Sequence, residues 1–156
     1  MTQPGRILVV DDEVNARSAL AELLREEGYV VETAADGFKA LPKLDEFAPD
    51  VLVTDLKMPG LDGLGLMRKA LEHDPERAVI LMTAFGAIET AVTAMRAGAA
   101  DYLTKPLNFD EISLAVERAL AGRRLRQEAG QLRQRFTARR RIPSVIGGSP
   151  PMQTVF

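Results

Sequence analysis

One stretch decides the fold of this chain, residues 50–60, which read Asp50-Val51-Leu52-Val53-Thr54-Asp55-Leu56-Lys57-Met58-Pro59-Gly60. The apolar, β-branched run at 51–53 is typical of a strand buried on both faces, as in parallel sheets covered by helices. Asp55 comes at the carboxyl end of this strand. Ligands of open α/β sheets bind outside that edge, so Asp55 is a candidate reactive group. Taken alone, Asp55 is more simply explained as a turn former, and the rest of the chain must decide.

Length and composition indicate one globular domain with an extension. The chain has 156 residues, of which 46% are hydrophobic, enough to build one buried core. No apolar run is long enough to span a bilayer, and residues 1–6 lack the plan of a signal peptide. Cysteine is absent, which excludes disulfides and thiolate metal sites. We therefore expect a cytoplasmic protein with no membrane partner.

The net charge of −2 hides a strong asymmetry along the chain. Residues 1–122 contain 12 Lys and Arg against 21 Asp and Glu, whereas residues 123–156 contain 8 Arg and 1 Glu. This pattern predicts an acidic domain followed by a basic tail. The tail lacks interleaved stacking aromatics apart from Phe136, which argues against a nucleic-acid surface.

Hydrophobic periodicity predicts five strands that alternate with five helices. The strands are expected at 7–10, 29–33, 51–53, 78–82 and 101–104, and the helices at 14–27, 37–47, 64–72, 87–97 and from 108 or 110 onward. Helices of this length between strands imply right-handed crossovers and a parallel sheet. We therefore expect an α/β, doubly wound, five-stranded sheet of flavodoxin-like order 2-1-3-4-5, with its switch point between the first and third strands.

That strand order brings acidic residues from two strand ends together. Asp11 and Asp12 follow the first strand and face Asp55 across the switch point. Three neighbouring carboxylates repel one another unless a proton or a cation neutralises them, and oxygen ligands favour Mg²⁺ or Mn²⁺. Thr83 and Lys105 follow the fourth and fifth strands and offer a hydroxyl and a compact positive charge. Together these side chains are suited to phosphoryl transfer.

In identity, order and spacing, these residues resemble the receiver domains of two-component response regulators. The resemblance covers about residues 5–121 and includes Met58-Pro59-Gly60, Thr83-Ala84 and Lys105-Pro106. It implies that Asp55 accepts a phosphoryl group from a cognate sensor histidine kinase. It also implies that a divalent cation binds to the carboxylates of Asp11, Asp12 and Asp55 and to the backbone carbonyl of Lys57.

The same resemblance assigns the other residues. Lys105 contacts the phosphoryl group, Thr83 moves towards it, and Tyr102 is an aromatic switch that turns inward. The Lys105-Pro106 peptide is often cis in this family. The surface formed by the fourth helix, fifth strand and fifth helix is expected to change on phosphorylation. The chain would then be a regulatory phosphoacceptor, assisting only its own phosphorylation and dephosphorylation, rather than an enzyme.

Two other classes of function remain open. A phosphatase with an aspartyl nucleophile usually has a second Asp two residues later as general acid, but that position is Lys57 here. A scaffold or binding module would hold a metal ion in the acidic crevice and never be phosphorylated. The glycines at 60, 63 and 65 lack the spacing of a dinucleotide loop, and we interpret them as a flexible turn.

The carboxyl-terminal residues indicate what the receiver domain controls. Residues 145–153 resemble the opening of the AAA+ ATPase domain of sigma-54-dependent transcription activators. We expect a receiver domain at 1–121, a helical linker at 122–142, and the start of a truncated AAA+ domain at 143–156. The chain has no G-x-x-x-x-G-K-[ST] motif and no evident helix-turn-helix, so sigma-54 RNA polymerase and DNA would be engaged only through domains missing here.

The linker also carries an apolar pattern that predicts a homodimer through a coiled coil and the receiver face. Its members follow one another at spacings of 4, 3 and 4, the a/d pattern of a short coiled coil: Leu125, Ala129, Leu132 and Phe136. The alternative is a single solvated helix, because Gly122 and Gly130 each weaken a helix by about 1 kcal/mol relative to Ala. Flanking arginines also repel across a parallel dimer.

Overall fold

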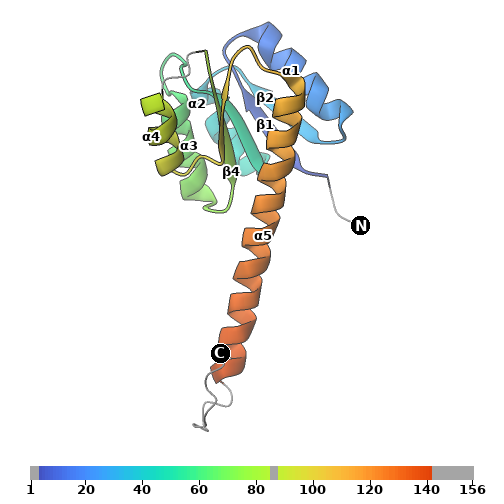
Figure 1. Cartoon of the computed structure of the whole chain (residues 1–156), viewed down its shortest axis with the longest axis vertical. Coiled ribbons are helices and arrows are strands. Elements are labelled where there is room, and N and C mark those ends of the chain that lie inside the picture. Colours follow the sequence, from blue (N-terminus) through green and yellow to red (C-terminus); the bar gives the residue numbers. More distant parts are fainter. Residues whose placement is uncertain (1–3, 85–87, 142–156) are drawn as a thin grey trace. The chain divides into compact units, whose positions relative to one another are not determined.

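The computed structural model describes the backbone of residues 4–84 and 88–141 and the side chains of residues 4–84 and 91–130 (Figure 1). Strands and helices alternate along the chain as predicted. The strands are β1 (Arg6–Val10), β2 (Val30–Ala34), β3 (Val51–Asp55), β4 (Ala78–Thr83) and β5 (Asp101–Thr104), and the helices are α1 (Val14–Glu26), α2 (Gly37–Glu46), α3 (Gly63–His73), α4 (Ile88–Arg96) and α5 (Phe109–Arg141).

The five strands form one parallel sheet in the order β2-β1-β3-β4-β5, which confirms the predicted topology. The register aligns the carboxyl ends of neighbouring strands: Val10 pairs with Thr54, and Thr83 pairs with Thr104. Asp55 pairs with Met82. The residues that follow β1, β3, β4 and β5 therefore lie along one edge of the sheet.

A hydrophobic layer covers each face of the sheet. Successive side chains of a strand point to opposite faces, so Ile7 and Val9 pack with α1 and α5, while Leu8 and Val10 pack with α2, α3 and α4. Figure 1 shows these two helical layers on opposite sides of the sheet. Every residue of β3 and β4 is buried, as the continuous apolar run at 51–53 predicted.

Local sequence signals begin and end the helices. The carboxylates of Glu13, Asp36 and Asp62 cap α1, α2 and α3 by accepting a hydrogen bond from a backbone N–H three residues later. Gly28 and Gly98 follow α1 and α4 with φ of +99° and +115°, a conformation that favours glycine. The Glu13 and Asp62 caps thus begin the helices that follow β1 and β3, the strands whose ends carry Asp11, Asp12 and Asp55.

The interpretation of the glycine-rich segment as one flexible turn is wrong for two of its three glycines. Gly60 does lie in a turn, with φ of +80°. Gly63 and Gly65 instead belong to the first turn of α3, where Asp62 caps the helix by accepting from the N–H of Gly65 at 2.8 Å. The Asp62 cap compensates for the low helix propensity of glycine.

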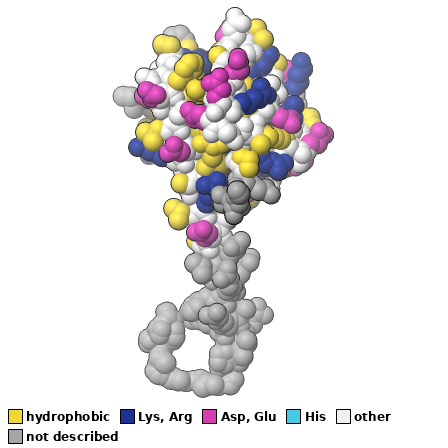
Figure 2. Space-filling view, turned by 90° about the vertical axis from the view of Figure 1, so that its right-hand side faces the viewer, with side chains coloured by type: hydrophobic (Ala, Val, Ile, Leu, Met, Phe, Trp, Pro, Cys, Tyr) yellow, Lys and Arg dark blue, Asp and Glu magenta, His cyan; other side chains and the backbone are white. Residues whose placement is uncertain are grey.

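The chain divides into two units, Met1–Arg123 and Arg124–Phe156. The first contains the sheet and all of its covering helices up to Arg123, and acidic and basic side chains are mixed over the face of it seen in Figure 2. The predicted AAA+ segment at 143–156 lies outside the described residues, and the predicted domain boundaries stay predictions. None of the described helices is both long and apolar enough to cross a membrane.

Candidate functional site

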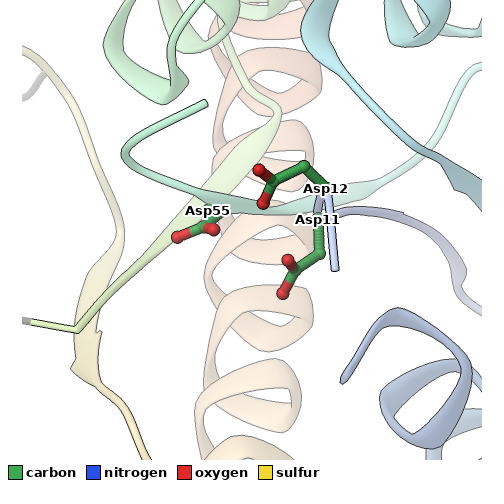
Figure 3. A group of neighbouring side chains, drawn as sticks. All are labelled: Asp11, Asp12 and Asp55. Carbon is green, nitrogen blue, oxygen red and sulfur yellow. The ribbon is translucent and has the colours of Figure 1, made fainter. Parts of the chain in front are cut away.

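Three carboxylates gather where β1 and β3 end (Figure 3). One oxygen each of Asp11, Asp12 and Asp55 lies within 4.8 Å of the others. Asp11 and Asp55 are only 2% and 8% exposed, whereas Asp12 is exposed to solvent. The acidic cluster predicted from the strand order is therefore present, with two buried carboxylates and one that solvent can reach.

A lysine side chain joins two of these carboxylates. The Nζ of Lys105 donates to Asp11 Oδ2 at 2.9 Å and to Asp55 Oδ2 at 3.4 Å. Lys105 immediately follows β5, and its backbone N–H donates to the carbonyl of Thr83 at 2.7 Å. The Lys105-Pro106 peptide bond is cis. The ammonium predicted at this edge thus lies within the acidic cluster, and its chain segment is held against the end of β4.

Burial and charge determine the ionisation of the two central groups. Burial raises the pKa of Asp55, the charge of Asp11 adds to this effect, and the attraction of Lys105 only partly offsets it. For Lys105, burial disfavours the charged form, but the hydrogen bond and charge of Asp11, with the charge of Asp55, outweigh burial and raise its pKa. The pKa of Lys105 is therefore higher than that of a free lysine, and the pKa of Asp55 is higher than that of a solvent-exposed aspartate.

The cluster fits a divalent cation. When ionised, its three carboxylates and one ammonium leave two negative charges uncompensated, which one divalent ion neutralises. All of the side-chain ligand atoms are oxygens, the kind that Mg²⁺ and Mn²⁺ prefer. Asp12 keeps one side of the cluster open to solvent. Lys57, predicted to contribute its carbonyl, is exposed two residues beyond Asp55, and this role stays a prediction.

The predicted switch residues lie on the two strands beyond β3. Thr83 is the last residue of β4 and is 3% exposed, at the same edge as Asp55. Tyr102 on β5 is half-buried and packs against the layer formed by α2, α3 and α4. Its hydroxyl oxygen is buried and has no hydrogen-bond partner among the described residues. The ring of Tyr102 is thus directed into the protein, and its role as a switch stays a prediction.

Two residues that support the site were missed by the sequence reasoning. Arg17 on α1 is half-buried and donates from Nη1 to the backbone carbonyl of Asp11 at 2.8 Å, which fastens the loop that carries Asp11 and Asp12. Gly63 packs so closely on the end of β3 that a Cβ there would meet the Asp55 carbonyl oxygen. A basic residue one turn into the helix that follows the Asp pair was the available signal for Arg17.

The predicted dimer seam is only partly described. Leu125 is 66% exposed and Ala129 is also exposed, as expected of residues that a second helix would cover in a dimer. An exposed position is equally compatible with a single helix. The side chains of Leu132 and Phe136 lie outside the described residues, so the seam stays a prediction.

Comparison with known proteins agrees with this site. The family model of the response regulator receiver domain matches residues 7–117. The regulatory protein AtoC of Escherichia coli (strain K12) is 37% identical over 155 residues, which are 99% of this chain and 34% of AtoC. The DNA-binding transcriptional regulator NtrC of the same strain is 36% identical over 154 residues, 99% of this chain and 32% of NtrC.

Solved structures of similar proteins also include a receiver domain. NtrX from Brucella abortus is 40% identical, with a TM-score of 0.79, and the match covers 85% of this chain and 30% of that chain. The separate receiver domain of NtrX is 42% identical, with a TM-score of 0.70, and covers 74% of this chain and 98% of that domain.

A doubly wound domain with an acidic, lysine-bridged cluster at its switch point belongs to the class of regulatory phosphoacceptor modules. This chain is a member of the response regulator receiver domain family. Its homology to AtoC and NtrC confirms the predicted relationship to sigma-54 activators. The chain spans about a third of the length of these two curated relatives.

Proposed function

We propose that this chain is a phosphorylation-dependent signalling switch in which Asp55 accepts a phosphoryl group from a sensor histidine kinase. One observation carries the proposal: the Lys105 ammonium bridges Asp11 and Asp55, the two buried members of the acidic cluster. A lysine in this place neutralises charge on a phosphoryl group, and membership of the receiver family supplies the kinase as its source.

In the proposed reaction an oxygen of Asp55 attacks phosphorus in line. A P–O bond forms, the P–N bond to the kinase histidine breaks, and the imidazole leaves. A divalent cation held by Asp11, Asp12, Asp55 and the Lys57 carbonyl would neutralise charge on the equatorial oxygens. Lys105 holds Asp55 through the longer of its two hydrogen bonds, 3.4 Å, and exchanges that bond for one to a phosphoryl oxygen.

The bound phosphoryl group then changes the state of the domain. Its added charge and acceptor oxygens attract the Thr83 hydroxyl and the Lys105 ammonium, which biases the loops after β4 and β5. Tyr102 lies on β5, which follows α4 and precedes α5 in the chain, and it transmits the change to the face formed by these three elements. In the whole protein this face controls a sigma-54-dependent ATPase, which contacts sigma-54 RNA polymerase and DNA through regions not contained in this chain.

Intact-mass measurement after incubation with Mg²⁺ and acetyl phosphate tests the proposed function. One stable added phosphoryl group supports a receiver. Continuous release of phosphate without a stable adduct would instead support the aspartyl phosphatase. No mass change with purified protein, repeated with Mn²⁺ in place of Mg²⁺, would support the unphosphorylated scaffold.

Replacing Arg17 with Gln is expected to weaken Mg²⁺ binding about tenfold, because a charge-assisted hydrogen bond to the Asp11 carbonyl contributes about 1.5 kcal/mol. Calorimetric titration with Mg²⁺ measures the affinity. Arg25 is a matched control on the same helix, since it donates to the carbonyl of Val31 at 2.8 Å. Arg25→Gln should leave the affinity unchanged, and equal losses in both variants would show that Arg17 acts only on the stability of α1.

Dimerisation through the linker predicts that the full chain sediments as a dimer and that removing the seam gives a monomer. The truncated chain should end at Arg124, because Arg123 forms ion pairs with Asp50 and Asp74 of the domain. Sedimentation equilibrium on both chains, with and without acetyl phosphate, makes the comparison. If both chains are monomeric at concentrations of tens of micromolar, the exposed Leu125 does not drive association.

A further inference from the structure

The last residue of the compact unit, Arg123, is fastened by two carboxylates. Its Nε donates to Asp50 Oδ1 at 3.0 Å, and its Nη2 pairs with Asp74 Oδ2 at 2.8 Å. Arg123 is 9% exposed, although it lies near the middle of the long helix α5. We call Arg123, Asp50 and Asp74 the Arg123 clamp. It ties α5 to the residue that precedes β3 and to the C-cap of α3.

The clamp has a rigid foundation at the amino-terminal edge of the sheet. Two hydrogen bonds with the backbone of Arg6 fix Asp50 in place. The Asp50 N–H donates to the Arg6 carbonyl at 2.8 Å, and Asp50 Oδ2 accepts from the Arg6 N–H at 2.9 Å. Arg77, 5% exposed, donates to backbone carbonyls on three segments around the clamp: Pro49 at 2.8 Å, Ala70 at 3.1 Å and Leu44 at 3.3 Å. Asp74 Oδ1 accepts from the N–H of Glu76 at 3.1 Å, so each of the two carboxylates has a backbone partner besides Arg123.

The position of the clamp on α5 is informative. Apolar packing of this helix on the sheet ends with Ala119 and Leu120, and Leu125 is already 66% exposed. Gly122 lies between, where it weakens the helix by about 1 kcal/mol relative to Ala. Arg123 thus supplies a side-chain anchor at the point where packing stops and the helix is intrinsically weak.

The choice of chemistry also argues for a positional role. Burying a long arginine costs side-chain entropy and desolvation, and apolar residues of similar volume often stabilise such a site equally well. A guanidinium fork held by two fixed carboxylates instead imposes one geometry. Burial opposes the ionisation of Asp74, but the hydrogen bond and charge of Arg123 outweigh it and lower the pKa of Asp74. The pair therefore remains charged near neutral pH.

We propose that the Arg123 clamp is the joint that makes the helix beyond residue 123 follow the domain. Asp50 immediately precedes β3, and Asp55 is the last residue of the same strand. The strand that ends in the candidate phosphorylation site therefore begins next to a member of the clamp. Movement of the domain elements that hold Asp50 and Asp74 would then be passed to the linker through this joint. The inference rests on the geometry of the clamp and does not require Asp55 to be phosphorylated.

Backbone ¹⁵N relaxation of the full chain tests the joint. In the unsubstituted protein, residues 124–130 should show order parameters of about 0.85, like the domain, and Arg123→Gln should lower them below about 0.6. Arg124→Gln is the matched control, because it removes the same charge from the exposed neighbouring residue. Arg123→Lys should give an intermediate result, since one ammonium does not reproduce the fork.

Two outcomes would overturn the joint: unchanged order parameters in Arg123→Gln, or an equal fall in Arg124→Gln. If Arg123→Gln does not fold, Asp74→Asn decides the matter, because it removes only one of the two ion pairs. A partial fall at 124–130 in Asp74→Asn supports the joint, and no fall overturns it. Repeating the measurement in an Asp55→Asn background separates this result from the proposed phosphorylation.

Discussion

Replacing Asp55 with Asn is expected to abolish phosphorylation while the domain stays folded. Asn keeps the shape of the side chain but lacks the nucleophilic carboxylate and one ligand of the cation. The fold should tolerate the change, because burial already disfavours the charged form of Asp55 and raises its pKa. Intact mass and peptide mapping after incubation with Mg²⁺ and acetyl phosphate measure the loss.

Asp62 provides the control for this variant. It lies seven residues later, is exposed, and caps α3 through its carboxylate. Asn caps helices about as well as Asp, so Asp62→Asn should fold and accept the phosphoryl group at the original rate. If Asp55→Asn took up phosphate at that same rate and on the same peptide, Asp55 would not be the acceptor.

Much of the fold follows from the sequence because its signals are local and agree with one another. The buried run at 51–53, the glycines after α1 and α4, and the acidic caps each mark one element boundary. Parallel pairing then requires that the strand ends share an edge. Asp11, Asp55 and Lys105 were predictable as neighbours for this reason, although they are distant in sequence.

The supporting contacts were not predictable in the same way. Arg17 binds a backbone carbonyl, and any side chain of suitable length on that face of α1 would look alike in the sequence. The Arg123 clamp joins residues 73 and 49 positions apart, and its partners Asp50 and Asp74 resemble ordinary loop carboxylates until α5 is packed in place. Such contacts depend on the distances between packed elements, which periodicity does not report.

Gly63 is the third residue whose supporting contact could not be predicted from the sequence. It leads to a prediction in which alanine has different effects on stability at Gly63 and at Gly65, two glycines of the first turn of α3. A Cβ on Gly63 would meet the Asp55 carbonyl oxygen and lie 2.8 Å from the Leu56 Cα. These are backbone atoms that cannot rotate away, so α3 or the end of β3 must shift. Gly63→Ala should therefore lower the free energy of unfolding by about 1–3 kcal/mol, the usual cost of overpacking.

The nearest atom to a Cβ on Gly65 is the Leu61 Cδ1, at 2.7 Å, which is the far end of a flexible side chain, and the next, Asp62 Oδ1, lies at 3.4 Å. Leu61 is half-buried and is able to rotate, while Ala gains about 1 kcal/mol over Gly inside a helix. Gly65→Ala should therefore leave the stability unchanged or raise it. Urea denaturation of both variants, compared through their midpoints at equal slope, measures the difference.

The same pair connects packing with the proposed chemistry. A shift of the Asp55 backbone moves the acceptor oxygen relative to Lys105 and the cation ligands, and a misplacement of about 1 Å is able to cost on the order of 100-fold in rate. Gly63→Ala should thus slow the gain of mass from acetyl phosphate, whereas Gly65→Ala should not. Equal stability and equal phosphorylation rates in the two variants would show that the close approach of Gly63 to β3 does not position Asp55.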